Sequence, residues 1–189
     1  MATYYVWDGG TNGAGTDWTS AKTTLAGAIA LATASGDVIM VAHTHTGDNA
    51  LAVDTTWTAG NHIAIISVDK TSSDAPTVMG TSAWLGSSSA SISLNVAGGY
   101  RIYLYGLTFR NAGSTNKSIT LGGTDGAQVE ASNCYLWLGT TNTSSGIVTG
   151  TASGSNNGFA MLENCTLRFG ATAQTMYRYA RLEMKNCSV

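Results

Sequence analysis

The sequence predicts an all-β protein, a right-handed parallel β-helix whose strands stack as the successive coils of a solenoid. A four-residue pattern carries this prediction: Asn, a buried-type residue, a polar or aromatic residue and an aliphatic residue follow one another three times, with Cys at the second position each time. Residues 106–109 fit the same frame with Gly in place of Asn and Leu in place of Cys. The copies begin 27, 31 and 22 residues apart. A constant strand core with variable spacing is typical of stacked coils joined by loops of different length. The copies are Gly106–Phe109, Asn133–Leu136, Asn164–Leu167 and Asn186–Val189.

Composition narrows the class of protein. Charged residues make up 11% of the 189-residue chain, and its formal net charge is −2, whereas an average soluble protein has about 25% charged residues. Hydroxyl and amide side chains supply the polarity instead, which favours an extracellular or virion protein over a cytosolic enzyme. Without a basic excess we expect no nucleic-acid partner. No apolar run approaches the roughly 20 residues of a membrane span, so no membrane partner is expected, and no Sec signal is visible at the N-terminus.

Residues 1–36 are expected to form an N-terminal cap of one strand, one turn and one helix. Tyr4–Trp7 is an aromatic strand, and the glycine-rich stretch 8–16 is interpreted as a turn, because it lacks the Gly-Lys-Ser/Thr of a phosphate-binding loop. A helix is predicted at about 20–34, with Gly36 just beyond its end. Its start can be capped by Asp17, Thr19 or Ser20, and its apolar face consists of Ala21, Leu25, Ala28, Ile29 and Ala32.

Residues 37–189 are expected to form the coils. Apolar strands are predicted at 37–42 and 63–68, which lie 26 residues apart, and further strands at 91–96 and 101–105. Loops such as 139–158 take up the variable spacing. The last copy of the pattern reaches Val189 with no cap after it, so the coils are expected to continue beyond residue 189 or to be covered there by a partner subunit.

The order of these elements resembles a known family. Tyr4–Trp7, the glycine-rich turn, Asp17–Ala21, the helix that ends at Gly36-Asp37 and the strand Val38–Ala42 look like the N-terminal cap of pectin-lyase-like right-handed β-helix proteins. Bacteriophage tailspikes and other virion β-helices begin in a similar way. The resemblance implies the fold for the whole chain but leaves its activity open, because lyases, hydrolases, adhesins and virion parts share this scaffold.

Two inward columns and an asparagine ladder follow from the register. The asparagines are expected at a bend, where Asn tolerates left-handed backbone geometry and its amide can bond to the Asn of the next coil. The three cysteines are interpreted as reduced, buried thiols rather than as disulfides or a zinc site. The columns are Leu107, Cys134, Cys165, Cys187 and Phe109, Leu136, Leu167, Val189, and the ladder is Asn133, Asn164, Asn186.

The outward columns contain the candidate binding residues. Beside Thr108, Tyr135, Thr166 and Ser188, the sequence places an aromatic–cationic patch on an exposed sheet face. Trp, Tyr and Arg are enriched in binding hot spots, so the patch can anchor a neighbouring protein or stack on a sugar ring. The alternative is that the loop 139–158 folds over the patch. Its members are Arg110, Tyr135, Trp137 and Arg168.

The eleven acidic residues are scattered singly, and no Asp-x-Asp or Asp-Asp cluster occurs. Glu130 and Glu183 are expected two coils apart, so about 9–10 Å separates them, the upper edge of the range for an inverting glycosidase pair. The coil between them offers Glu163 in a different register. No catalytic residue is therefore predicted.

His43 and His45 are weak candidates for a metal site. They alternate along a strand and would need a third ligand such as His62 or Asp48. The alternative is that they are polar residues where a strand passes into a turn. We predict no metal and no other cofactor.

Together these observations favour a non-enzymatic structural protein on the exterior of a phage particle, either a capsid decoration or a segment of a tail spike or fibre. The expected partners are other virion proteins and copies of the same chain, with a trimer as one arrangement, and a host surface glycan as a further candidate. The alternative is a tailspike or secreted protein that binds or depolymerises glycans.

Overall fold

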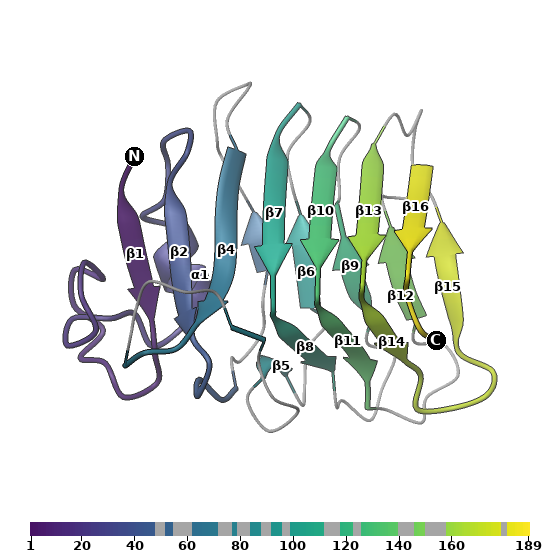
Figure 1. Ribbon diagram of the computed structural model, residues 1–189, viewed down its shortest axis with the longest axis horizontal. Coiled ribbons are helices and arrows are strands. Elements are labelled where there is room, and N and C mark those ends of the chain that lie inside the picture. Colours follow the sequence, from purple (N-terminus) through teal and green to yellow (C-terminus); the bar gives the residue numbers. More distant parts are fainter. Residues whose placement is uncertain are drawn as a thin grey trace.

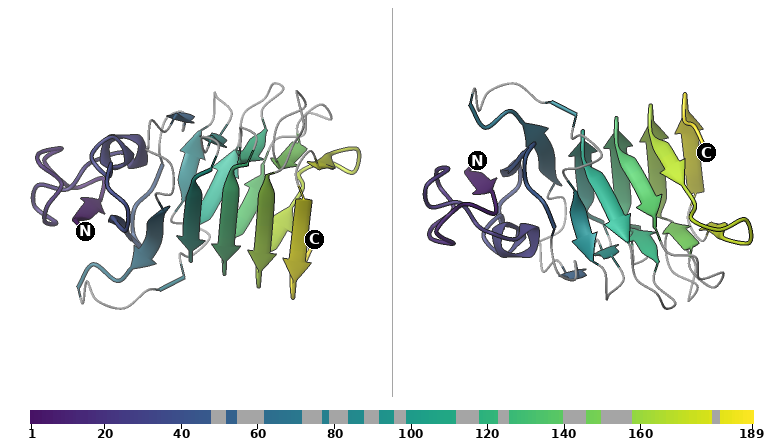
Figure 2. Two further views of the ribbon diagram at one scale, coloured as in Figure 1. Left: turned by 90° about the horizontal axis from the view of Figure 1, so that it is seen from above. Right: turned by 90° about the horizontal axis from the view of Figure 1, so that it is seen from below.

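The computed structural model describes residues 1–47, 52–54, 62–71, 77–78, 84–87, 92–95, 99–111, 118–122, 126–139, 146–149, 158–178 and 181–189. They form three sheets in which every strand pairing is parallel. The strands lie side by side along the long axis of the molecule, from the N-terminal cap to the C-terminal strand (Figures 1 and 2). The protein is a parallel β-solenoid, which confirms the predicted fold class.

The three sheets contain seven, four and five strands. The first consists of β1 (Thr3–Val6), β2 (Val38–Ala42), β4 (His62–Val68), β7 (Arg101–Tyr105), β10 (Gln128–Ser132), β13 (Phe159–Glu163) and β16 (Arg181–Lys185). The second consists of β5 (Leu85–Ser87), β8 (Thr108–Asn111), β11 (Tyr135–Leu138) and β14 (Thr166–Arg168). The third consists of β3 (Ala52–Asp54), β6 (Ile92–Asn95), β9 (Ile119–Leu121), β12 (Gly146–Thr149) and β15 (Thr175–Arg178).

The register of the first sheet follows the spacing of the sequence pattern. Gln128 pairs with Arg101 and with Phe159, and Phe159 pairs with Arg181, so the coils advance by 27, 31 and 22 residues. Ile39 pairs with Ile65, the predicted interval of 26 residues. One expectation was too simple: the segment 139–158 contains a strand of the third sheet, β12, in addition to loops.

A residue with left-handed backbone geometry follows each of the last four strands of the first sheet, β7, β10, β13 and β16. Asn133, Asn164 and Asn186 have φ angles of 53°, 53° and 52°. The backbone N–H groups of Asn133 and Asn164 donate to Glu163 and Lys185 of the next coil, at 3.0 and 2.9 Å, so the turn continues the hydrogen bonding between coils. The predicted geometry of the bend is confirmed.

The expected amide ladder is absent from these turns. The Asn133 side chain donates to Ser132 Oγ within its own coil, at 3.2 Å, and no bond joins it to the Asn164 side chain in the described part of the chain. The asparagines are therefore selected by backbone conformation, because Asn populates the left-handed region more readily than other residues with a side chain.

Gly106 occupies the same turn in an earlier coil, with a φ angle of 68°. A Cβ atom at this position would lie 2.7 Å from the carbonyl oxygen of Thr77, and a contact below 3.0 Å would force the backbone apart. The segment Thr77–Val78 therefore passes over this turn so closely that only glycine fits. This explains why the first copy of the pattern begins with Gly.

The solenoid interior is filled by the predicted columns. Leu107, Cys134 and Cys165 are at most 2% exposed, as are Phe109, Leu136 and Leu167. Stacking like residues on one another fills a narrow core that has no second layer. Burial decreases in the last coil of the described chain, where Cys187 is half-buried and Val189 is 83% exposed.

The cap covers the other end of the core. The helix α1 (Leu25–Ile29) contacts β1, β2 and β3, and Ala21, Leu25, Ala28, Ile29 and Ala32 are all buried, as predicted. The helix is shorter than the expected 20–34. Thr24, rather than an earlier residue, is its N-cap, since its side chain accepts from Gly27 N at 3.1 Å. Asp17 instead accepts from Ser20 N at 2.6 Å in the preceding turn.

Candidate functional site

The second sheet carries a stack of alternating tryptophan and arginine side chains that runs from coil to coil. Trp137 pairs in register with Arg110 on one side and with Arg168 on the other. The guanidinium carbon lies 4.2 Å from the Trp137 ring centre for Arg110 and 5.0 Å for Arg168. Trp84 extends the stack, 5.2 Å from the guanidinium of Arg110. We call these four residues, Trp84, Arg110, Trp137 and Arg168, the Trp–Arg column.

Trp84 joins the column because the residue of β5 beside Arg110 is a glycine and has no side chain. Gly86 is the residue in register with Arg110, and Trp84 lies two residues earlier on the same face of the strand. The turn after β2 holds it there, since Gly47 N donates to Trp84 O at 2.6 Å and Trp84 N donates to His45 O at 3.1 Å. The sequence patch did not include Trp84, because nothing near it in the sequence reveals this register.

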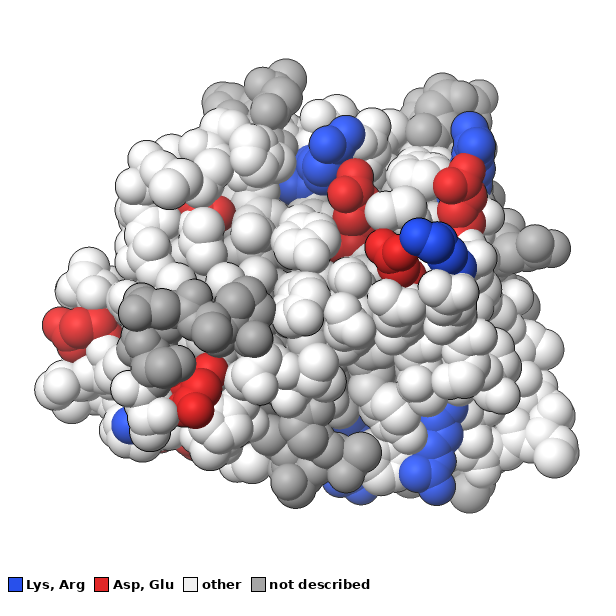
Figure 3. All heavy atoms as spheres, in the orientation of Figure 1, with Lys and Arg blue, Asp and Glu red and all other residues white. Residues whose placement is uncertain are grey.

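The arginines of the column stack on rings but form no ion pair with a carboxylate of the described residues. Arg110 Nε is buried without a hydrogen-bond partner. In Figure 3, blue atoms lie at the lower edge of the molecule with no red atoms against them. Among the described residues the column is thus a positive strip without a carboxylate partner, in which an indole ring contacts each flat guanidinium.

The same geometry changes the expected role of Trp137. Arg110 and Arg168 come from the strands on either side of β11 and cover both faces of its ring. Trp137 therefore has no free face on which to stack a sugar. Its exposed edge carries the positive part of the ring quadrupole, so it adds to the positive character of the strip.

A small hollow of about 170 Å³ lies beside the column, at the turn side of the second sheet. Tyr135 links the two features, since it lines the hollow and meets the Trp137 ring edge to face, with centroids 6.4 Å apart. Hydroxyl and amide groups supply most of the remaining polar lining. We call this cavity the turn hollow; its lining is Val78, Thr108, Asn133, Cys134, Tyr135, Asn164 and Thr166.

Thr108 was expected on an exposed outward column but is 1% exposed. Val78 also lines the hollow, and Thr77–Val78 covers the adjacent Gly106 turn. Thr77–Val78 therefore covers this end of the hollow, a position that its local sequence does not predict. The alternative cover, the loop 139–158, lies mostly outside the described residues, apart from Gly139, β12 and Gly158.

The candidate acids lie on the first sheet, and each has a basic partner. Glu130 and Glu183 are in register with Met161 between them, and Glu163 is two residues out of step, as expected. Figure 3 shows red and blue side by side over this sheet. The pairs are Arg101–Glu130 at 3.5 Å, Lys185–Glu163 at 2.6 Å and Arg181–Glu183 at 2.5 Å.

His43 and His45 lie in different surroundings. His45 is 0% exposed and neither ring nitrogen has a hydrogen-bond partner, whereas His43 lies in a turn 3.8 Å from Asp69. Burial lowers the pKa of His45, and the negative charge of Asp8 opposes this shift in part. The described residues contain no group of three metal-ligating side chains; Asp48 lies outside them.

The three cysteines are free thiols that donate to backbone carbonyls. Cys165 Sγ lies 3.4 Å from Ala131 O, and Cys187 Sγ lies 3.2 Å from Leu162 O, each in the preceding coil. The hydrogen bond with Cys165, reinforced by burial, raises the pKa of Cys134 well above its ordinary value. The same hydrogen bond lowers the pKa of Cys165 to about 7. Burial therefore identifies Cys134 and Cys165 as core thiols, since both are at most 2% exposed.

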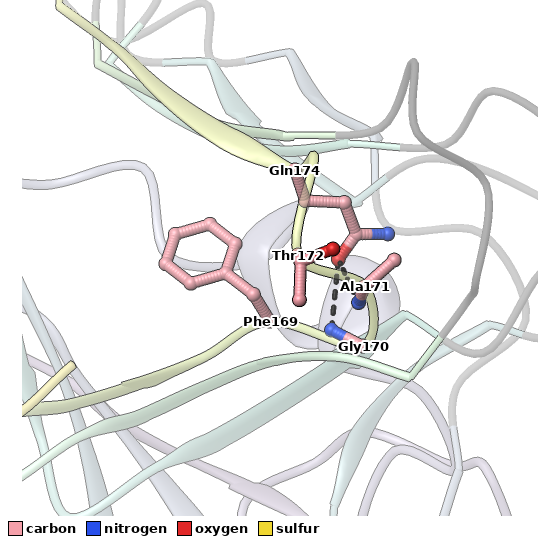
Figure 4. A pocket seen from close by; sticks show the side chains of 5 residues that line it. All are labelled: Phe169, Gly170, Ala171, Thr172 and Gln174. Atoms are coloured by element: carbon pink, nitrogen blue, oxygen red, sulfur yellow. Dashed lines mark hydrogen bonds between the residues drawn. The ribbon is translucent and has the colours of Figure 1, made fainter.

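A second hollow, of about 400 Å³, lies at the loop between β14 and β15. Figure 4 shows the Gln174 amide turned toward the backbone of the loop, with the Phe169 ring on the other side. Gln174 Oε1 accepts from Gly170 N at 2.8 Å and Ala171 N at 3.3 Å. The lining of Phe169, Gly170, Ala171, Thr172 and Gln174 contains no ionisable side chain, so this hollow is a product of loop closure.

Comparisons of the chain with protein-family models, with curated proteins and with solved structures found no match. Within the described residues, the helix is too short to cross a membrane. The class of protein that the fold defines is therefore a parallel β-solenoid with an exposed Trp–Arg column.

Proposed function

We propose that this chain is a non-enzymatic structural protein on the exterior of a bacteriophage particle, either a capsid decoration or a segment of a tail spike or fibre. The resemblance of its N-terminal cap to pectin-lyase-like and virion β-helices suggests this setting. A β-solenoid suits it, because each coil buries a constant core and the stack forms a stiff rod with long flat faces.

One observation carries the non-enzymatic part of the proposal. Glu130, Glu163 and Glu183 are the acids nearest to a catalytic arrangement, and each pairs with a lysine or arginine on the same sheet. Each of these carboxylates is therefore already engaged by a basic side chain, and Lys185 joins Glu163 to the next coil. These acids support the stack of coils instead of a reaction.

The Trp–Arg column is the face that we assign to binding. Aromatic and arginine side chains supply much of the free energy of binding at protein interfaces, and this strip holds them rigid before any partner arrives. In the proposed setting the partner is another virion protein or a further copy of this chain.

The experiment is to purify phage particles from cells that carry the encoding genome and to measure the copy number of this chain by quantitative mass spectrometry. We expect a fixed copy number that survives a salt wash and matches a multiple of the particle symmetry. Absence from the particles, with the chain in the medium or the cell lysate, would contradict the proposal.

The second candidate is a protein that binds or processes glycans. The turn hollow favours it, since hydroxyl and amide groups beside a tyrosine are suited to sugar hydroxyls. Release of reducing ends or of unsaturated uronate from host polysaccharide would distinguish processing from binding.

A further inference from the structure

We propose that Cys165 and Cys187 form a redox site at which a hydroperoxide converts two thiols into a disulfide between neighbouring coils. Both residues are free thiols in the structure, so the disulfide is a product of oxidation and not the resting state. The proposal concerns the interior of the solenoid and does not rest on the function assigned to the Trp–Arg column.

The register of the coils places the two residues opposite each other. Thr166 and Ser188 form a parallel bridge between their coils, and Ser188 N donates to Cys165 O at 3.0 Å. Cys165 and Cys187 come directly before these two residues, so they occupy equivalent positions on adjacent coils, about 4.8 Å apart. Disulfides join residues whose Cα atoms lie about 4.4–6.8 Å apart. The backbone spacing of the solenoid therefore already suits a disulfide.

The two sulfur atoms point in the same direction. Each lies against a carbonyl oxygen of the preceding coil: Cys165 Sγ is 3.4 Å from Ala131 O, and Cys187 Sγ is 3.2 Å from Leu162 O. Ala131 and Leu162 are themselves in register, so the second thiol repeats the orientation of the first one coil further on. A hydrogen bond joins the Cys187 thiol to Cys165. The two sulfur atoms are therefore neighbours before any oxidant arrives.

The surroundings of the two thiols differ in the way that a two-step oxidation requires. Cys187 is half-buried whereas Cys165 is 1% exposed, so a peroxide reaches Cys187 first. The hydrogen bond with Cys134 lowers the pKa of Cys165 to about 7, so a large fraction of Cys165 is thiolate at neutral pH. The thiolate is the form that attacks another sulfur. Cys187 is therefore the thiol that is oxidised first, and Cys165 is the thiol that resolves it.

The reaction consumes one hydroperoxide for each disulfide. The Cys187 thiolate attacks hydrogen peroxide, an S–O bond forms as the O–O bond breaks, and the released hydroxide takes up a proton to become water. The Cys165 thiolate then attacks the sulfur of this sulfenic acid. The S–S bond forms, the S–O bond breaks, and the hydroxyl group leaves with a proton as a second water. The two thiols lose two electrons and two protons in all, and the peroxide accepts them.

The test treats the whole reduced chain with hydrogen peroxide, alkylates the remaining thiols with iodoacetamide in denaturant and maps disulfides by mass spectrometry. Cleavage after Glu163, Arg168 and Lys185 places the three cysteines on three separate peptides. We expect the peptide of Cys165 to be joined to that of Cys187, with the third cysteine alkylated. The disulfide closes a loop of 22 residues, so we also expect the melting temperature to rise by about 6–12 °C and to fall back on addition of dithiothreitol.

Three variants separate the roles of the thiols. Cys187→Ser, at a half-buried position, should form no disulfide and show no rise in melting temperature. Cys165→Ala leaves Cys187 without its resolving thiol, so sulfenic acid should accumulate there and be trapped by dimedone. Cys134→Ala is the matched control, because it removes a thiol of the same column but keeps the pair. It should form the same disulfide, more slowly at pH 7, since Cys165 loses the hydrogen bond that lowers its pKa.

Four results would overturn the proposal: no disulfide after peroxide treatment, a disulfide between Cys134 and Cys165 in its place, two chains linked through Cys187, or a rise in melting temperature that persists in Cys187→Ser. The peptide map of the parent chain and the Cys187→Ser measurement decide the outcome even if Cys165→Ala, which shortens a buried side chain, fails to fold.

Discussion

Replacing Asn164 tests whether left-handed backbone geometry alone stabilises the turns between coils. Its φ angle is 53°, its backbone N–H donates to Lys185 O at 2.9 Å, and its exposed side chain has no hydrogen-bond partner among the described residues. Asn164→Ala therefore removes no side-chain bond. Both residues carry a Cβ atom, but alanine adopts a positive φ less readily than asparagine, at a cost of up to about 1–2 kcal/mol.

Asn164→Gly is the matched control. Glycine adopts a positive φ without steric cost and loses only chain entropy, so its cost should be no more than about 0.5–1 kcal/mol. Gly106→Ala is the opposite extreme, because it combines the same backbone strain with a Cβ atom 2.7 Å from Thr77 O. We expect it to cost more than Asn164→Ala, since overpacking adds about 1–3 kcal/mol.

The assay is equilibrium denaturation in urea, with differential scanning calorimetry as a second measurement. For a chain of 189 residues, each kcal/mol lowers the melting temperature by about 2–4 °C, so Asn164→Ala should lower it by roughly 2–8 °C. The expected order of destabilisation is Gly106→Ala, then Asn164→Ala, then Asn164→Gly. If Asn164→Gly is as destabilised as Asn164→Ala, the asparagine amide and not the backbone stabilises the turn, and the reasoning is refuted.

Three further predictions follow from the histidine, the thiols and the acids. Burial holds the pKa of His45 below its ordinary value of 6.5, so the unfolded chain binds a proton that the folded chain does not, and stability should fall as pH drops below about 6.5. Melting curves from pH 7.5 to 5 should show this fall, and His45→Leu should reduce it, with the exposed His62→Gln as control. An undiminished slope in His45→Leu would assign the effect to other groups. A thiol reagent should label Cys187 first, because it is half-buried, and should label the buried Cys134 and Cys165 only on denaturation. Mass spectrometry counts the labelled thiols, and rapid labelling of all three in the native protein would contradict the inward register. Host polysaccharide incubated with the chain should show no reducing-end release, since Glu130 and Glu163 are ion-paired; release that disappears in Glu130→Gln or Glu163→Gln would reverse the non-enzymatic assignment.

The outer strand of the first sheet bears on self-association of the chain. β16 is the outer strand of its sheet in the described chain, and Met184 and Val189 are 39% and 83% exposed. Sedimentation of the 189-residue chain should show self-association, and a monomer that melts cooperatively would count against that expectation.

The residue pattern by itself determined the fold, the coil intervals and the inward columns. Stacked coils repeat the same local environment, so each copy of the pattern reports the same turn and the same buried positions, and Asn133, Asn164 and Asn186 reveal their left-handed turns through composition alone. The patch of Arg110, Tyr135, Trp137 and Arg168 followed from the same register. The local sequence pattern was sufficient to predict the position of a residue wherever its neighbours are the equivalent residues of adjacent coils.

Only the tertiary structure decided which segments from outside the repeated pattern contact the second sheet and its turns. Trp84 enters the column because Gly86 has no side chain to fill the position beside Arg110 and the turn after β2 holds the Trp84 backbone. The close approach of Thr77–Val78 requires a glycine at residue 106. The faces of Trp137 are closed by arginines from two other coils. These contacts join segments of unrelated sequence across loops of variable length, and nothing in the local pattern fixes how such a loop crosses the surface of the solenoid.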